Sequence, residues 1–522
     1  MEAHALSPRD FFEPARQPFS ELIADLQHPD AFDLQEARIE ELVVGRGREV
    51  LRTLLQGFFH SRSQDRPLGP VVGQEGVART QRRPEVERDL TTELGAVVVP
   101  RVSFGTPGHA SRRPLDAALN LPATLYSFPL GKLVAEQVAH TSFEQAQNTI
   151  AKQTGVTIGR RQLEEEAQRA AVDFLAFYQQ RQQTPLPSGS KRPLRSRTGG
   201  LLILSADGKG VVMRTQALRE ETRKKAEAAA KSLKRRLSPG EKKDRKRMAE
   251  VAAVYTLEPF VRTSADIVRE GQAVQDATRV RPKPEDKRVW ASLVQSIEEV
   301  IEEQFEEAHW RDPERCKAWV ALVDGNKTQI AAYEREAKKH GVKLFVLVDI
   351  IHVLEYLWKA ALPLHAGARD EAETWVTEHL VARLEGDARN VAAGIRRRAT
   401  LRGLSAKERE AVDDGADYLR DYAPYLRYAE ALAAGYPIAT GVIEGACRHL
   451  VQDRMDITGA RWCLASAEAV LRLRALQSSG DGEEYWQFHE QREYERNHAA
   501  GYADQQPPAM ASPGKTRLRR VK

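Results

Sequence analysis

Cysteine is scarce in this chain, which has three cysteines in 522 residues, namely Cys316, Cys447 and Cys463. They show no paired spacing, so neither a disulfide framework nor a zinc site is expected. Long apolar runs are missing too, since no stretch of about 18 apolar residues is available to span a bilayer. The opening residues lack the basic and apolar regions of a signal peptide. These absences favour a reduced, intracellular protein without a membrane partner.

A large excess of charge of one sign is also lacking, because the formal net charge is +5. The hydrophobic content of 41% and the charged content of 29% are typical of a globular protein. A chain of this length exceeds one ordinary domain, and we expect roughly two to four. The sequence pI of about 8.9 leaves room for local basic clusters, which matter more for nucleic-acid binding than the total charge.

Residues 1–140 predict a recognition region that is mainly helical. Apolar residues recur at three- and four-residue spacing through 1–60, which indicates helices. Residues 61–115 are instead rich in Arg, Gly and Pro, and they contain a β-type run at 94–104. This run predicts a small strand unit within the recognition region.

Residues 141–184 resemble a helix-turn-helix segment. Ser142 is placed to cap a helix over 143–153, a Gly-containing turn follows at 154–156, and a second helix is expected from Thr157 to Ala170. Arg160 and Arg161 fall near the start of the second helix, where base-edge and phosphate contacts are usually made. An ordinary helical hairpin with solvated arginines remains the alternative.

A basic, Pro- and Ser-rich linker at 185–198 precedes a region of alternating strands and helices. The expected strands are 201–207, 211–214, 251–256, 318–324 and 342–348, with a turn at 208–210, and the expected helices are 283–309 and 327–339. An antiparallel meander followed by crossover-connected strands beside the first is the order of the ribonuclease-H fold. We therefore predict a mixed α/β fold with a ribonuclease-H-like core.

The core is expected to be interrupted by a large helical insertion. The predicted parts are a first core segment at 199–349, the insertion at 350–435, core helices at 436–497 and a disordered basic tail at 498–522. The mainly helical DNA-binding region precedes all of them.

Three carboxylates, Asp207, Asp324 and Glu444, stand where such a core binds metal. Each has an ordinary explanation when taken alone: Asp207 and Asp324 as turn formers after strands, and Glu444 as a glutamate near the start of a helix. Together they predict a site for Mg²⁺ or Mn²⁺, because the two strands that end in aspartate lie side by side in this topology. Two such ions about 4 Å apart support phosphoryl transfer on a nucleic-acid backbone.

Asp349 and His352 form a competing pair at the end of the last strand. Asp-x-x-His places two ligands on one helical turn, so the pair is a metal site, a helix cap with a core histidine, or a DNA contact. Strand order favours Asp324 as the second catalytic acid, and the pair is assigned an auxiliary role.

Basic residues near this site predict DNA contacts. Residues 219–247 hold thirteen Lys/Arg against five Asp/Glu, a local net charge of +8, and include Lys234, Arg235 and Arg236. Lys209 follows Asp207 closely. Arg461 and Trp462 offer a cation and an aromatic platform beyond Glu444, although a buried tryptophan is an equally good interpretation.

Five strings occur in the order found in one family of proteins. They are Ser-Ala-Asp-Gly-Lys-Gly-Val (205–211), Val-Asp-Gly-Asn (323–326), Asp-Ile-Ile-His-Val-Leu-Glu-Tyr-Leu-Trp (349–358), Thr-Gly-Val-Ile-Glu-Gly-Ala-Cys-Arg-His-Leu (440–450) and Thr-Gly-Ala-Arg-Trp (458–462). With Pro-Leu-Asp-Ala-Ala-Leu-Asn-Leu-Pro (114–122), they resemble the ISKra family of bacterial insertion-sequence transposases, which is related to the ISL and Mutator groups. The resemblance covers roughly 90–480.

The resemblance implies a DDE transposase whose triad falls on Asp207, Asp324 and Glu444. Asp349 and His352 resemble the Cys-x-x-His element of Mutator-like enzymes, with Asp replacing Cys. Some relatives carry a cysteine-rich zinc motif before the Pro-Leu-Asp segment, but residues 94–113 contain no cysteine, so a zinc-stabilised recognition module is not expected here.

The expected partners are double-stranded DNA, both element ends and target, and further copies of the chain, because two ends must be synapsed. The expected location is the bacterial cytoplasm, in association with the nucleoid. Two alternatives stay open: a domesticated, non-catalytic DNA-binding protein, and a structure-selective nuclease of the same fold.

Overall fold

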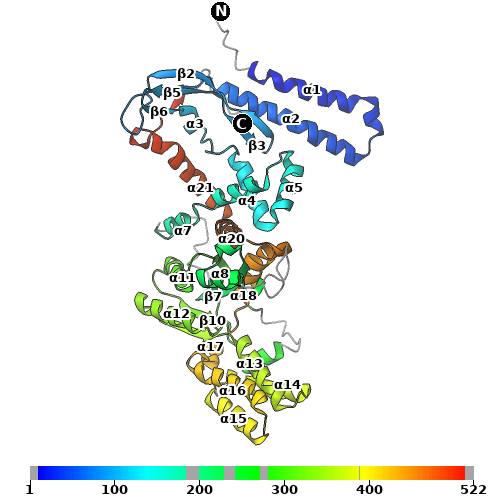
Figure 1. Ribbon diagram of the computed structural model, residues 1–522, viewed down its shortest axis with the longest axis vertical. Coiled ribbons are helices and arrows are strands. Elements are labelled where there is room, and N and C mark those ends of the chain that lie inside the picture. Colours follow the sequence, from blue (N-terminus) through cyan, green and yellow to red (C-terminus); the bar gives the residue numbers. More distant parts are fainter. Residues whose placement is uncertain (1–9, 184–198, 229–241, 271–279, 387, 512–522) are drawn as a thin grey trace, which may run out of the picture. The chain divides into compact units, whose positions relative to one another are not determined.

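The computed structural model describes residues 10–183, 199–228, 242–270, 280–386 and 388–511. They form two compact units, one of Met1–Phe177 with Gly482–Lys522 and the other of Tyr178–Asp481. Figure 1 labels the elements of both units. None of the helices in the described part of the chain combines the length and the hydropathy needed to cross a membrane.

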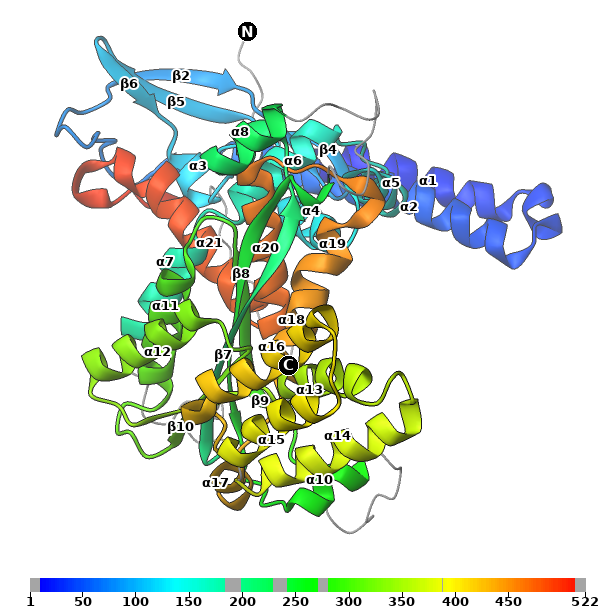
Figure 2. The ribbon, with the colours of Figure 1, turned by 60° about the horizontal axis from the view of Figure 1, so that its bottom comes forward.

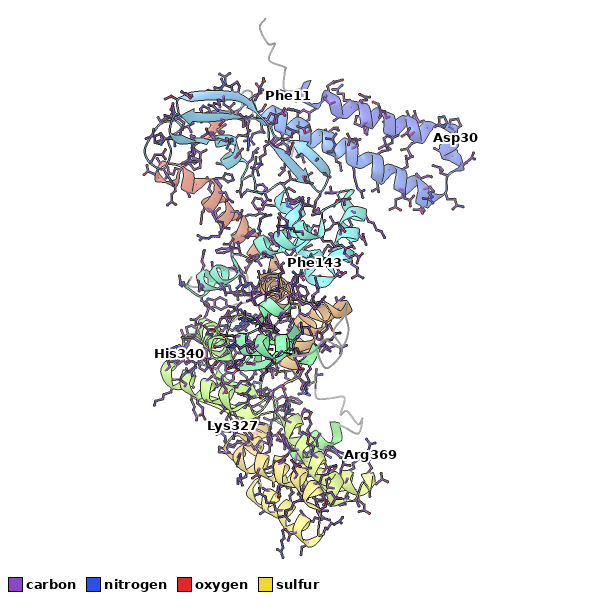
Figure 3. All side chains as sticks on the ribbon, viewed as in Figure 1. Phe11, Asp30, Phe143, Lys327, His340 and Arg369 are labelled. Atoms are coloured by element: carbon purple, nitrogen blue, oxygen red, sulfur yellow. The ribbon has the colours of Figure 1, made fainter. Side chains whose placement is uncertain are left out.

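The first unit begins with a pair of long helices, α1 (Glu13–Gln27) and α2 (Glu36–Arg62), which lie side by side in Figures 1 and 2. Figure 3 labels Asp30 in the turn between them. The predicted helices within 1–60 are confirmed. The short helices are η1 (Asp10–Phe12) and η2 (Pro29–Asp33).

A small strand unit follows α2, as the sequence predicted. Its strands are β1 (Arg66–Pro67), β2 (Gln81–Val86), β3 (Asp89–Thr92), β4 (Gly95–Val98), β5 (Arg101–Thr106) and β6 (His109–Arg112). The predicted run 94–104 is thus two strands, β4 and the first part of β5. Val99 and Pro100 separate them, and proline has no N–H to donate to a strand ladder.

Five helices follow these strands in the chain. They are α3 (Pro114–Ala118), α4 (Phe128–His140), α5 (Phe143–Thr154), α6 (Arg160–Ala170) and α7 (Phe174–Gln183), and residues 178–183 of α7 belong to the second unit. Ser142 caps α5 in a capping box with Gln145, and Gly155 ends the helix in the left-handed conformation at φ 75°. The helix predicted from Thr157 begins only at Arg160, because Gly159 is in extended backbone. Ile158 before it is fully buried, and its carbonyl accepts a hydrogen bond from Gln147.

The segment predicted to be a disordered tail is folded up to residue 511. It contains η8 (Ala499–Gly501), η9 (Ala503–Gln505) and β12 (Met510–Ala511), which pairs with β1. His498 and Tyr502 are buried, and His498 Nε2 lies 2.8 Å from the Leu121 carbonyl oxygen. These buried side chains explain why a Pro- and Gln-rich composition does not leave this stretch unfolded. Residues 512–522 lie outside the described part of the chain.

The second unit is built on a mixed five-stranded sheet. Its strands are β7 (Leu201–Val212), β8 (Lys246–Leu257), β9 (Glu285–Ser292), β10 (Ala318–Val323) and β11 (Leu344–Val348), and their order in the sheet is β11-β10-β7-β8-β9. β7, β8 and β9 pair antiparallel, whereas β10 and β11 run parallel to β7. The expected antiparallel meander and the crossover-connected strands beside the first are therefore present in a mixed α/β unit.

Two sequence-based assignments within the meander are wrong. The predicted turn at 208–210 does not form, because β7 continues through Gly208 and Gly210 to Val212 and pairs with β8 along its whole length. The two stretches 201–207 and 211–214 thus belong largely to one strand, with Asp207 in its middle. Figure 2 shows β7 and β8 running side by side.

The long helix predicted over 283–309 is also wrong in its first part. Residues 285–292 form β9, and the helix α11 begins only at Ile297 and ends at Arg311. Residues 288–292 are all buried, and a strand covered on both faces gives no alternation to distinguish it from a helix. Ser296 and Glu299 form the capping box that marks the true start of α11.

One face of the sheet is covered by α11 and α12 (Lys327–His340), and Figure 3 labels the two ends of α12. Gln304 of α11 donates from Nε2 to the carbonyl oxygens of Ser205 and Ala253, and its Oε1 accepts from the Tyr333 hydroxyl. Phe305 packs on Trp319 of β10. Because Trp319 pairs with Leu202, the even-numbered residues of β7 face these helices.

The insertion and the remaining helices complete the unit. The insertion contains α13 (Ile350–Leu364), α14 (Arg369–Leu384), α15 (Ala388–Leu401), α16 (Ala406–Asp421), η5 (Ala423–Tyr425) and α17 (Tyr428–Ala433), in agreement with the predicted helical stretch 350–435. After it come α18 (Gly441–Ala446), the π-helical turn η6 (Cys447–Gln452), α19 (Asp453–Met455), η7 (Ile457–Gly459) and α20 (Leu464–Ser479). The other short elements are η4 (Thr215–Ala217), α8 (Glu220–Ala228) and α10 (Ser264–Glu270). The next helix, α21 (Gly482–Asn497), belongs to the first unit, although the sequence grouped it with the core.

Candidate active site

Three aspartates follow the register of three neighbouring strands. The parallel pairing of β10 with β7 has a constant offset of 117 residues as far as Leu322 and Ser205, and continuing this offset by two residues aligns Asp324 with Asp207. The pairing of β10 with β11 has an offset of 25 residues, which places Asp349 in the same row, and the Asp349 amide donates to the Val323 carbonyl. Residues in one row of a sheet point to the same face. All three carboxylates therefore face away from α11 and α12.

The spacing of this row suits a shared metal site. Neighbouring strands lie about 4.8 Å apart, so this register brings Asp207 and Asp324 to adjacent strands, although the ligand atoms of Asp207, Asp324 and Glu444 do not all lie within 4.8 Å of one another. Both side chains are partly exposed. A pair of divalent ions bridged by carboxylates has a similar separation, about 4 Å.

Glu444 is brought toward this face by the helix that carries it. Cys447, three residues later on the same helix side, is buried, and its Sγ lies 3.3 Å from Asp207 Oδ2. Burial raises the pKa of the Cys447 thiol, and the carboxylates of Asp207 and Glu444 raise it further while Lys209 opposes them. The thiol is therefore protonated at neutral pH and donates to Asp207.

Helix α18 passes directly into the π-helical turn η6. Arg474 of α20 donates to the backbone carbonyls of His449 and Leu450 within this turn. Single π-helical turns are rare and occur frequently at functional sites. Here the turn begins at Cys447, the residue that contacts Asp207.

Asp349 has a defined structural role at this face. Its side chain is fully buried; Oδ1 caps α13 by accepting from the Ile351 amide at 2.7 Å, and Oδ2 accepts from both the amide and the hydroxyl of Thr440. Thr440 is the residue before α18, and its carbonyl accepts from the Glu444 amide. Asp349 therefore fixes the start of the helix that carries Glu444.

His352 is partly exposed on the first turn of α13, and its Nδ1 lies 3.8 Å from Glu355 Oε2. Because both oxygens of Asp349 are already hydrogen-bonded, a two-residue metal site formed by Asp349 and His352 is not supported. The helix-cap interpretation of Asp349 is the one that the geometry bears out.

The helical insertion contributes a tyrosine to the end of β10. The Tyr418 hydroxyl donates to the Asp324 carbonyl at 3.3 Å, and its ring stacks on Tyr356 with centroids 3.9 Å apart. Gly325 has φ +97°, and a Cβ at this position would lie 2.8 Å from the Tyr418 hydroxyl oxygen. A glycine is thus required where the insertion covers the Asp324 turn.

The oxygen atoms available at this face fit a hard divalent cation. Asp324 Oδ1 accepts from the Asn326 amide, but within the described residues its Oδ2 and the exposed carboxylate of Glu444 have no hydrogen bond or ion pair. Asp207 Oδ1 accepts from the Gly208 amide and Oδ2 from the Cys447 thiol. A thiol is a weak donor, so Asp207 Oδ2 is readily given up to a metal.

A tighter cluster lies in the first unit. In the described part of the chain, the three side chains whose potential ligand atoms all lie within 4.8 Å of one another are Asp173, His489 and Glu493. Arg496 already binds this cluster, because it donates to both oxygens of Asp173 and to Glu493. The cluster is therefore a buried ion-pair network that joins α21 to the segment between α6 and α7.

The predicted DNA-contacting residues have different environments. Arg160 and Arg161 are exposed on the first turn of α6, and they pair with Glu144 and Glu165 across 3.0 Å. Lys209 is partly exposed on the same face as Asp207, and Arg461 is exposed. Lys234, Arg235 and Arg236 lie outside the described residues.

Trp462 is not an exposed aromatic platform for DNA. Its side chain is 5% exposed, the indole N–H donates to the Met455 carbonyl, and the Arg454 guanidinium lies 4.8 Å from the ring centroid. The alternative of a buried tryptophan is correct. Its backbone forms a bridge to Met213, at the end of β7.

Cys447, Thr440 and Tyr418 were not identified from the sequence as parts of this site. The signal for Cys447 was its position three residues after Glu444, on the same side of one helix. Thr440 and Tyr418 act through tertiary contacts for which the sequence has no local pattern. No family model and no curated protein matches the chain.

Proposed function

We propose that this chain is a DNA transposase of the bacterial insertion-sequence type, with a ribonuclease-H-like core. The strand order of the second unit supports this proposal, because a three-stranded meander with two parallel strands added beside its first strand is the arrangement expected of such a core. The resemblance of five motifs to ISKra transposases supports it independently. The helical insertion lies between Asp324 and Glu444, as the resemblance implies.

The observation that carries the proposal is the row formed by Asp207 and Asp324, approached by the helix of Glu444. Two carboxylates in register on adjacent strands are an ordinary coincidence in a sheet. A third on a helix held against the first by Cys447 and anchored to the row by Asp349 is more specific.

Asp207, Asp324 and Glu444 would hold two Mg²⁺ or Mn²⁺ ions. When bound, these ions stabilise the charge on the attacking and leaving oxygens of an in-line displacement at phosphorus. Asp324 and Glu444 supply oxygens that have no hydrogen bond or ion pair with any described residue, and Asp207 supplies one now held by a thiol. Lys209 lies two residues beyond Asp207 on the same face, where its ammonium group neutralises a phosphate.

The reaction proposed is hydrolysis of a phosphodiester at an element end, followed by strand transfer. Water displaces the 3′ oxygen at phosphorus, so the cleaved strand carries a free 3′-hydroxyl. This hydroxyl then displaces the 3′ oxygen of a phosphodiester in target DNA. The first unit would bind the terminal repeats, and two copies of the chain would bring two ends together.

The decisive experiment is metal-dependent cleavage of DNA that carries the inverted repeats flanking the gene. Wild type is compared with Glu444→Gln, which keeps the shape of the side chain and removes its charge. Glu410→Gln is the matched control, because Glu410 is an exposed glutamate on α16 without a charged partner among the described residues. We expect cleavage to fall at least a hundredfold in Glu444→Gln and to be unchanged in the control.

The outcomes separate the alternatives. Loss of cleavage with end binding retained supports a catalytic carboxylate site. Binding by all three proteins without cleavage by any supports a domesticated DNA-binding protein. Cleavage of branched DNA without preference for the element ends supports a structure-selective nuclease, and equal cleavage by all three proteins overturns the role of Glu444.

A further inference from the structure

A basic pocket lies at the far end of β7. Its volume is about 550 Å³, and it is lined by Met213, Arg214, Thr215, Gln216, Arg245, Gly459 and Arg461. The three arginines come from three separate segments: the end of β7, the turn before β8 and the loop after η7. The described residues that line the pocket include no aspartate or glutamate.

The arginines of this pocket form no ion pair with a carboxylate of the described residues. Arg245 is buried and donates to the Thr215 hydroxyl and the Ala226 carbonyl, and Arg214 and Arg461 are exposed. In the described part of the chain, no carboxylate forms an ion pair with any of the three. Elsewhere in this unit, arginines such as Arg288 and Arg396 are paired with carboxylates. Three cations around one pocket repel each other unless an anion is bound.

The backbone around the pocket is fixed. Met213 forms a parallel bridge with Trp462, and its amide donates to the Arg245 carbonyl. The Arg214 amide donates to the Trp462 carbonyl, and the Trp462 amide donates to that of Val212. The three segments that carry the arginines are therefore held together by main-chain hydrogen bonds, so the pocket is built before any ligand arrives.

We propose that this pocket binds a phosphate group of the DNA backbone together with its nucleotide. Arginine presents several N–H donors in a fork that matches phosphate oxygens, and such charge-assisted bonds are the strong ones. The volume lies within the range of sites that hold a whole small ligand, and it exceeds what a phosphate alone requires. The inference rests on the proposed function, since it assigns the pocket to the same DNA.

The position of the pocket suits this role. Met213 is six residues from Asp207, which corresponds to roughly 20 Å along a strand. At about 3.4 Å per base step, this distance spans about six nucleotides. The pocket thus lies outside the carboxylate site but within reach of the same DNA strand.

The test measures DNA affinity without catalysis. The full chain is titrated, in EDTA and at several chloride concentrations, into a fluorescein-labelled 40-base-pair duplex, and the Arg214→Ala/Arg461→Ala double variant is compared with wild type. The control is Lys338→Ala/Arg397→Ala, which removes two exposed charges from α12 and α15 of the same unit. We expect the double variant to bind about tenfold more weakly at low salt, with the slope of log K against log [salt] reduced by about 1, and the control to match wild type.

Inorganic phosphate is the second probe. It separates a DNA site from a site for free phosphate, because its binding is followed as a thermal shift without DNA. If phosphate stabilises wild type but not the Arg214→Ala/Arg461→Ala variant, and this variant binds DNA as tightly as the control variant does, the pocket binds free phosphate. The DNA assignment is then overturned. If the two double variants show equal salt slopes and phosphate causes no thermal shift in wild type, the pocket binds neither ligand and the proposal is overturned. Because no metal or cleavage is involved, these outcomes are independent of whether Glu444 is catalytic.

Discussion

The thiol of Cys447 donates to the carboxylate of Asp207, with 3.3 Å between Sγ and Oδ2. This contact ties the helix that carries Glu444 to the strand that carries Asp207. It also places a neutral, weak donor on an oxygen that a metal would take. The contact therefore holds the two parts of the site together without competing strongly for the carboxylate.

Alkylation should distinguish Cys447 from the exposed Cys316. Burial raises the pKa of the Cys447 thiol, and the neighbouring carboxylates raise it further. Since the thiolate is the reactive form, we expect iodoacetamide at pH 8.5 to modify Cys316 at least a hundredfold faster. Mass spectrometry of the native and the urea-unfolded protein measures both rates. Equal labelling of the two cysteines in the native protein would show that the contact with Asp207 does not hold.

Removal of the Asp349 carboxylate should destabilise the second unit. Asp349→Ala leaves the Thr440 amide and hydroxyl without an acceptor in a buried position and uncaps α13, which we expect to cost about 3 kcal/mol of unfolding free energy. Urea unfolding measures this loss. A double-mutant cycle with Thr440→Val should give a coupling energy of about 1–2 kcal/mol. Additive effects would contradict a direct role of Asp349 in positioning α18.

Gly325→Ala should disturb the contact between Tyr418 of the helical insertion and the turn that follows Asp324. At φ +97° an alanine is strained, and its Cβ would lie 2.8 Å from the Tyr418 hydroxyl oxygen, so we expect a loss of about 2 kcal/mol in stability. Cleavage should fall as well, because Asp324 precedes the distorted residue. Gly441→Ala is the control, since a Cβ there meets no atom within 4 Å. A Gly325→Ala protein as stable as the control would refute the contact.

The Asp173 network should make the first unit sensitive to acid. Burial raises the pKa of Asp173, but hydrogen bonds from His489 and Arg496 outweigh it and lower the pKa to about 2, from an ordinary value of 3.8. A carboxylate with a lowered pKa stabilises the fold fully above its unfolded pKa, and this stability is lost as the pH falls from about 4 through 2. We expect a contribution of about 1–2 kcal/mol at pH 7.

Amide hydrogen exchange in α6 and α21 measures this contribution locally. Asp173→Asn should exchange faster than wild type at pH 6, and the difference in opening free energy should shrink toward pH 3. Asp33→Asn removes an exposed aspartate from the same unit and should have no effect. A difference between wild type and Asp173→Asn that does not change with pH would argue against an ionised Asp173.

Local sequence patterns were sufficient to identify helices and strands that have one exposed face and a recognisable capping or turn signal at one end. The capping box at Ser142 and the alternation of helix and strand after residue 297 identified their elements. The patterns failed where burial removed the contrast between apolar and polar faces, as in β9, whose residues 288–292 are all buried. They failed again at Gly208 and Gly210, because pairing with β8 keeps these glycines in a strand that their own preferences would end.

Asp207, Asp324 and Glu444 were predicted from strand ends, a helix start and motif resemblance. The register of the sheet aligns the two aspartates, whereas Glu444 lies on helix α18. Strand order favoured Asp324 over Asp349 as the second acid, but the structural role of Asp349 could not be predicted. Both aspartates follow an apolar strand of similar length, so the local pattern around them is the same. The hydrogen bonds of Asp349 to Thr440 are tertiary contacts, and they reveal its role in positioning α18.

The π-helical turn η6 sets the direction in which the side chains between Glu444 and Arg461 point around the helix axis. A π turn holds one more residue than an α turn, so it shifts the side chains after it by about 100° around the helix axis relative to those before it. Deletion of one residue within Cys447–Gln452 would restore a regular α-helix. The residues after the turn would then be rotated around the helix axis relative to Glu444. The number of residues in this short segment thus sets the orientation of Arg461 and the basic pocket relative to the carboxylate face.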